Sequence, residues 1–176
     1  MQYIIKFGVL CRESDGQRLA SIKGSVTGPE KKIWSENAQA SWSAGILSEG
    51  ITESGKRDIR KKEYVLRDQN SHIAATGKPQ YKEGDEPDVA GWPLSRLPRV
   101  DHAELSIYDI PYRLTMYTGG RYDLQDTDGN SVLRIVHRGI SGGWDLETQY
   151  VFPAEIICGI FVFCRYIEYE NEFLTV

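Results

Sequence analysis

The chain has 176 residues, of which 40% are hydrophobic and 26% are charged, and its formal net charge is −4. These values fit a single globular domain over residues 1–176 and exclude a disordered or low-complexity protein. The acidic balance also argues against a nucleic-acid-binding module, which usually has a basic excess. The odd number of cysteines and the lack of a basic and apolar leader predict free thiols and a cytoplasmic protein.

Three segments with a similar pattern, residues 9–25, 64–79 and 122–139, each predict one β-hairpin. Each has an arm of alternating apolar residues, a polar turn and a second arm. The turn residues tolerate the positive φ of tight hairpins; they are Asp15, Gly16, Asn70, Asp128, Gly129 and Asn130.

Short strands are also expected between these hairpins, each with a tryptophan that faces the core. They cover residues 32–34, 41–43 and 144–147 and include Trp34, Trp42 and Trp144. Turn signals recur at intervals typical of a β-sandwich or β-barrel, and not of alternating strands and helices.

The densest charge cluster lies at residues 56–62 and contains Lys56, Arg57, Arg60, Lys61 and Lys62. Each exposed cation contributes about 1 kcal/mol near an anionic membrane, so the cluster is a candidate site for phospholipid headgroups or another anionic ligand. The alternative is a solvated hairpin edge, where lysines discourage pairing with other strands.

Residues 77–98, from Gly77 to Pro98, lack regular alternation and contain several prolines. We expect a long ordered loop, held to the body by apolar side chains, because an unanchored loop of this length is uncommon. Its aromatic residues Tyr81 and Trp92 make the loop a candidate docking site for a protein partner.

Two polar motifs invite a chemical interpretation. Asp101 precedes His102, a pair that suggests a general base, but neighbours on an extended strand point to opposite faces, so a structural network is the favoured interpretation. The run from Asp126 to Asn130 resembles part of a calcium loop, but its spacing would make Leu124 the first ligand. We interpret it as a hairpin turn and predict no metal site and no cofactor.

Residues 139–143 match the G-x-S-x-G motif of α/β-hydrolases, with Ser141 as the nucleophile. That motif requires a helix after the serine, followed by the acidic residue and the histidine of the triad. Here a strand is expected next, and all three histidines precede Ser141. A flexible turn is therefore favoured over a serine hydrolase.

Residues 156–164 form an apolar run interrupted by Gly159 alone, after a helix start at Pro153. Such a helix faces no water, and its length of about 14 Å is too short to cross a bilayer. We expect a buried helix that emerges at Arg165, Glu168 and Glu170, followed by a closing strand over residues 172–176.

The repeated hairpins and the apolar helix together resemble the tubby C-terminal-like superfamily, which includes tubby proteins, phospholipid scramblases and LURP-one-related proteins. The small bacterial members are the most similar. The residues that carry the resemblance are 122–129, 144–147 and 153–167. It implies a closed barrel of about twelve mostly antiparallel strands around a central C-terminal helix.

The barrel geometry agrees with this implication. Twelve tilted strands enclose a space just wide enough for one helix with its side chains, about 12 Å. Tubby proteins bind phosphoinositides through scattered basic residues, which have no residue-by-residue counterpart here. The leading hypothesis is a non-enzymatic barrel that binds an anionic ligand or a membrane surface; the alternative is a protein-interaction module that uses the 77–98 loop.

Overall fold

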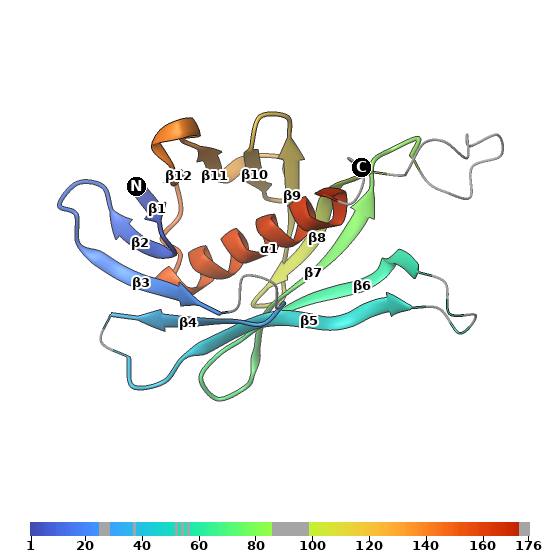
Figure 1. Cartoon of the computed structure of the whole chain (residues 1–176), viewed down its shortest axis with the longest axis horizontal. Helices are drawn as coiled ribbons and strands as arrows, with labels where there is room; N and C mark the ends of the chain where they lie inside the picture. Colours follow the sequence, from blue (N-terminus) through green and yellow to red (C-terminus); the bar gives the residue numbers. More distant parts are fainter. Residues whose placement is uncertain are drawn as a thin grey trace.

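The structure is a computed structural model that describes residues 1–24, 29–36, 38–51, 53, 55, 57–85 and 99–172. Within these residues, twelve strands close into one barrel around one helix (Figure 1). The strands are β1 Gln2–Lys6, β2 Val9–Arg12, β3 Arg18–Lys23, β4 Lys31–Ser35, β5 Trp42–Ile51, β6 Arg57–Arg67, β7 Ile73–Tyr81, β8 Val100–Ile107, β9 Ile110–Tyr117, β10 Arg121–Gln125, β11 Ser131–His137 and β12 Trp144–Thr148. The predicted barrel is confirmed.

The strands follow one another around the barrel in chain order, and every neighbouring pair is antiparallel. The barrel closes where β12 pairs with β1, with Tyr3 opposite Leu146. Closure therefore uses the first strand of the chain and not the closing strand that we expected over residues 172–176. The described part of α1 reaches Glu172, and residues 173–176 lie outside the described part of the chain.

The helix α1, Ala154–Glu172, lies in the barrel as predicted. Every residue from 156 to 164 is buried, so this segment faces the strands on all sides. Gly159 is required by packing, because a Cβ at this position would lie 2.4 Å from Cδ2 of the fully buried Leu66. The apolar run is explained by the core that it fills.

The helix emerges at Arg165 on one side only, where Arg165 and Tyr169 are exposed. Tyr166 and Ile167 are buried, and the side chain of Glu170 is only 3% exposed. The polar residues of the last turns find partners within the protein, so burial continues past the point where the apolar pattern ends.

All three predicted hairpins are present, as β2–β3, β6–β7 and β10–β11. Gly16 and Gly129 have the expected positive φ, but in the β6–β7 turn Ser71 takes this conformation instead of Asn70. Trp42 and Trp144 pack against the core as predicted. Trp34 is half-buried and is not among these core-packed residues, because its neighbour Ile33 occupies the inward position.

The predicted loop at residues 77–98 begins later than expected. β7 continues to Tyr81 and pairs with β8, with Gly77 opposite Leu105 and Pro79 opposite Ala103. Gly77 and Pro79 interrupt the apolar alternation of β7, so the sequence pattern did not predict the full length of this strand. Residues 86–98, including Trp92, lie outside the described part of the chain.

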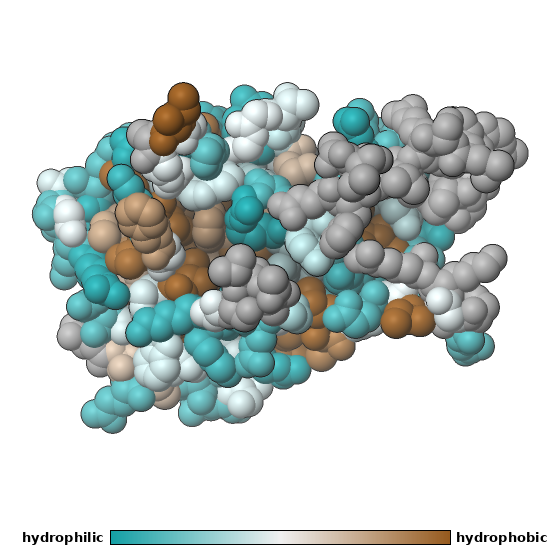
Figure 2. Space-filling model, viewed as in Figure 1, coloured by the Kyte–Doolittle hydropathy of each residue, from teal (hydrophilic) through white to brown (hydrophobic). Residues whose placement is uncertain are grey.

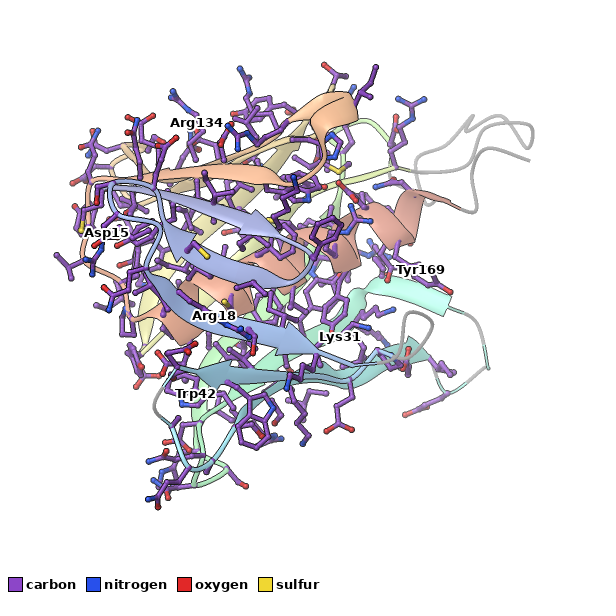
Figure 3. The ribbon with its side chains drawn as sticks, turned by 60° about the vertical axis from the view of Figure 1, so that its left-hand side comes forward. Asp15, Arg18, Lys31, Trp42, Arg134 and Tyr169 are labelled. Carbon is purple, nitrogen blue, oxygen red and sulfur yellow. The ribbon has the colours of Figure 1, made fainter. Side chains whose placement is uncertain are left out.

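The barrel has two ends, which we name after the helix. The entry rim contains the turns near the start of α1, and the exit rim contains the turns near its end. In Figure 3, Asp15 and Trp42 lie toward the entry rim, whereas Lys31 and Tyr169 lie toward the exit rim. The β1–β2, β9–β10 and β11–β12 turns belong to the exit rim and are consecutive around the barrel.

Candidate functional site

The basic cluster at residues 56–62 does not form one exposed surface. Lys56 and the side chain of Arg57 lie outside the described part of the structure. Arg60 is exposed, but its Nε lies 2.9 Å from Oδ1 of Asp58. Lys61 is exposed on the wall of the barrel. Cations that are adjacent in the sequence therefore do not share one surface, because successive residues of β6 point to opposite faces of the sheet.

Lys62, the last member of the cluster, points into the protein and is 5% exposed. It shares the inward alternation of β6 with Tyr64 and Leu66, which are fully buried. Its Nζ lies 2.6 Å from Oε1 of Glu170 and 3.7 Å from Oε2 of Glu49. The expectation that Lys62 contributes to a surface site is therefore wrong: this lysine ties the end of the helix to the sheet.

A different group of residues stands out at the exit rim, starting with Phe7. Phe7 and Gly8 form the β1–β2 turn, and both have positive φ, 51° and 74°. Asparagine and glycine favour this backbone conformation, whereas a bulky residue there is strained. The Phe7 side chain is 93% exposed. Neither its backbone nor its burial explains a phenylalanine at this position.

Ile140 is a second apolar residue without a core contact. It lies in the short 3₁₀ turn Gly139–Ser141 between β11 and β12 and is fully exposed. Figure 2 shows an apolar projection at the place of this turn. An isoleucine at the tip of a turn contributes nothing to the barrel core.

The turns that carry these residues are neighbours. An ideal Cβ on Gly143 would lie 2.9 Å from the Ile5 carbonyl oxygen and 3.5 Å from Cβ of Lys6, which places the β11–β12 turn beside β1. On its other side, the His137 N–H donates to the Gly120 carbonyl oxygen at 3.0 Å. The β9–β10, β11–β12 and β1–β2 turns therefore form one continuous part of the exit rim.

Cationic side chains accompany the apolar ones in these three turns. The Nζ of Lys6 lies 5.6 Å from the centre of the Phe7 ring, and the Arg121 guanidinium lies 4.4 Å from the centre of the Tyr117 ring. Lys6 and Arg121 form no salt bridge with any described carboxylate. We call this group the exit patch; it consists of Lys6, Phe7, Tyr117, Arg121, Arg138 and Ile140.

Arg138 is the only cation of the exit patch with a described carboxylate partner, Asp145 at 3.1 Å. Both side chains of this pair are well exposed, so the pair is weak and screened by salt. The sequence analysis missed the exit patch because its members are far apart in the chain. The signal that was available was a phenylalanine before Gly8, where a hairpin turn favours asparagine.

The Ser141 motif does not have the geometry of a hydrolase elbow. The turn Gly139–Ser141 connects β11 to β12, so a strand and not a helix follows the serine. Asp126 forms the expected hairpin turn, in which its Oδ1 accepts the N–H groups of Asp128 and Asn130. Among the described residues, no group of three or more histidines, cysteines or carboxylates is placed to hold a metal ion.

Asp101 and His102 do interact, although the sequence suggested opposite faces. The Nδ1 of His102 lies 2.6 Å from Oδ1 of Asp101. Their strand has a bulge here, since Tyr81 pairs with Val100 whereas Gln80 pairs with His102, which leaves Asp101 as the extra residue. A bulge breaks the alternation and brings the two side chains together. Asn171 of the helix bonds both backbone groups of Val100, which fixes this distortion.

The three cysteines are free thiols, as predicted. Burial raises the pKa of the Cys158 and Cys164 thiols far above the usual range, so neither is a reactive thiolate. None of the described helices has the length and apolar character needed to span a bilayer.

Comparisons with family models, curated proteins and solved structures find no match for this chain. The resemblance to the tubby C-terminal-like superfamily therefore stays a prediction.

Proposed function

We propose that this protein is a non-enzymatic barrel that binds anionic phospholipid surfaces with its exit patch. The observation that carries the proposal is Phe7, an almost fully exposed aromatic residue in a turn conformation that disfavours it. A residue that is both strained and solvated lowers stability, which suggests a role in binding.

The composition of the exit patch fits the interface between water and a bilayer. Aromatic side chains are favoured at the headgroup level, and cations attract anionic headgroups. Lys6 and Arg121 supply about 1 kcal/mol each near an anionic surface. Insertion of Phe7 and Ile140 adds about 1.5–3 kcal/mol each where burial is complete. After the costs of association, this total supports reversible peripheral binding.

Sedimentation with vesicles tests the proposal. We expect the protein to pellet with phosphatidylcholine vesicles that contain an added anionic phospholipid, and to remain in solution with neutral vesicles. Binding should weaken as salt is raised, because the cations are exposed. Equal sedimentation with both kinds of vesicle would contradict the electrostatic part of the proposal.

Charge reversal at the two rims provides a matched comparison. Lys6→Glu with Arg121→Glu should reduce binding to anionic vesicles by at least about tenfold, since two favourable charges become repulsive. Arg12→Glu with Arg18→Glu makes the same change in net charge at the entry rim and should have a much smaller effect. Equal losses for both pairs would show that net charge, and not the exit patch, controls binding.

A further inference from the structure

The entry rim carries exposed apolar side chains of its own, between the β8–β9 turn and the segment before α1. Tyr108 is 54% exposed and Ile110 is 55% exposed. Ile110 is followed on the same face of β9 by Tyr112, whose ring centre lies 6.3 Å from that of Phe152. Phe152 in turn stacks on Tyr150 at 6.1 Å. We call these residues, together with the exposed Val151, the entry patch.

Carboxylates lie beside the entry patch. The entry-rim turns at residues 13–17, 36–41, 68–72, 108–109 and 126–130 contain no lysine or arginine, and their acidic members are Glu13, Asp15, Glu36, Asp68, Asp109, Asp126 and Asp128. Arginines flank some of these turns: Arg12 and Arg18 form exposed salt bridges with Asp15 and Glu36, and Arg67 donates to the Ser71 carbonyl oxygen. The turns nearest the patch contain Asp68, Asp109 and Asp126. An apolar surface with this border is complementary to a partner that combines apolar and cationic side chains.

Carboxylates near the entry patch also affect its tyrosines, Tyr108 and Tyr112. The pKa of Tyr108 is raised, first by partial burial and then by the carboxylates of Glu155 and Asp68. The pKa of Tyr112 is also raised, first by partial burial, then by Tyr150 and Asp126. A cation that approaches these rings therefore meets a favourable field in addition to the ring faces.

Tyr108 also occupies a turn position that disfavours it. Tyr108 and Asp109 form the two-residue β8–β9 turn, with φ values of 48° and 64°. An aspartate tolerates this conformation, but a tyrosine is strained. As with Phe7, an exposed aromatic residue is kept at a position where folding favours asparagine.

We infer that the entry patch docks a polypeptide segment of a partner protein that carries both lysine or arginine and large apolar residues. The apolar side chains of the segment cover Tyr108, Ile110 and the aromatic group, while its cations meet Asp68, Asp109 and Asp126. An anionic membrane or a nucleic acid is repelled by the same carboxylates. This inference is independent of the proposed membrane binding, which uses the opposite end of the barrel.

Fluorescence anisotropy with a defined peptide tests the inference on the full chain. The probe is a labelled amphipathic peptide of leucine and lysine, and its counterpart has every lysine replaced by glutamate. We expect the lysine peptide to bind, with an affinity that falls as salt is raised, and the glutamate peptide not to bind. Absence of binding by the lysine peptide, or equal binding by the two peptides, would overturn the inference.

Two triple variants locate the site. Asp68→Asn, Asp109→Asn and Asp126→Asn together remove the charge beside the entry patch, while asparagine retains the oxygen that accepts the turn hydrogen bonds of Asp68 and Asp126. Glu13→Gln, Asp15→Asn and Glu36→Gln change the net charge equally on the far side of the same rim. We expect about tenfold weaker peptide binding for the first variant and little change for the second. Similar losses in both would contradict a local site.

Tyr108→Asn removes the ring without damaging the turn, because asparagine favours a positive φ. It should weaken peptide binding severalfold, and unchanged binding would argue against the apolar part of the site.

Sedimentation velocity of the protein alone tests whether the occupant of the entry patch is a second copy of this chain. Association of this chain with itself at low salt, abolished by the neutralised entry patch, would show that the partner is a second copy and overturn the inference of a separate protein.

Discussion

Each rim of the barrel has an exposed aromatic residue in a turn with positive φ, but the charges around the two residues have opposite signs. At the exit rim, Phe7 lies in a positive-φ turn beside Lys6, whereas at the entry rim Tyr108 lies in such a turn beside Asp109. Both side chains are exposed, and neither is needed for the core. The comparison shows that an exposed aromatic residue does not by itself identify the class of ligand, because the charges around the ring determine what approaches it.

The largest effect is expected inside the exit end, at Lys62. Lys62→Met leaves Glu170 buried without its 2.6 Å partner and should lower the free energy of unfolding by about 3–5 kcal/mol. Denaturation with urea measures this loss. The double variant Lys62→Met with Glu170→Leu should recover most of it, since no charge is left behind. If Lys62→Met were neutral for stability but lost vesicle binding, Lys62 would belong to the surface site after all.

Gly159→Ala tests whether the two rims depend on one core. The helix propensity of alanine favours the variant by about 1 kcal/mol, but the clash with Leu66 costs about 1–3 kcal/mol in a packed interior. We expect a net loss of up to about 2 kcal/mol, in a single unfolding transition seen equally by probes of both rims. Separate transitions for the entry and exit rims would show that they fold independently.

Replacing the two turn aromatics by asparagine tests the two proposed binding activities separately. Phe7→Asn and Tyr108→Asn should each stabilise the protein by about 1 kcal/mol, because asparagine relieves the strain of a positive φ. Thermal unfolding measures this gain. Phe7→Asn should weaken vesicle binding alone, and Tyr108→Asn should weaken peptide binding alone. A variant that lost both activities would remove the distinction between the rims.

The smallest expected effect is on the stability of the fold at low pH. The pKa of Asp126 lies below its usual value of 3.8, mainly because the Asn130 N–H donates to this carboxylate in the folded turn. A lowered pKa in the folded state stabilises the protein above the unfolded pKa, and this contribution is lost as the pH falls through the folded value. Asp126→Asn should therefore reduce the acid sensitivity of folding below about pH 4. An NMR titration of Asp126 at or above 3.8 would contradict this origin.

Local patterns were sufficient for most of the barrel. The alternation at residues 9–25, 64–79 and 122–139 and the apolar run at 156–164 predicted three hairpins and the buried helix, because apolar periodicity reflects burial directly. The pattern failed where packing overrides it. The loop was expected to begin at Gly77, before the end of β7. Glu170 was expected to emerge from the barrel, but it is buried because it pairs with Lys62.

The candidate site was predicted poorly, for a reason that Lys62 makes clear. A charge cluster in the sequence need not be a cluster in space, because successive residues of a strand face opposite sides of the sheet. Adjacent Lys61 and Lys62 lie on opposite faces of β6, one exposed and one buried. Conversely, Phe7 and Ile140 are far apart in the chain, and only barrel closure brings their turns together.

The sequence by itself determined the kind of fold, since alternating apolar residues, turn glycines and one apolar helix leave few ways to bury the core. Only the tertiary structure decided which side chains share a surface. The pairing of β1 with β12 joins the first residues of the chain to residues near position 140 at the exit rim. Such a contact depends on the registers of all the strands between them, which no local pattern encodes.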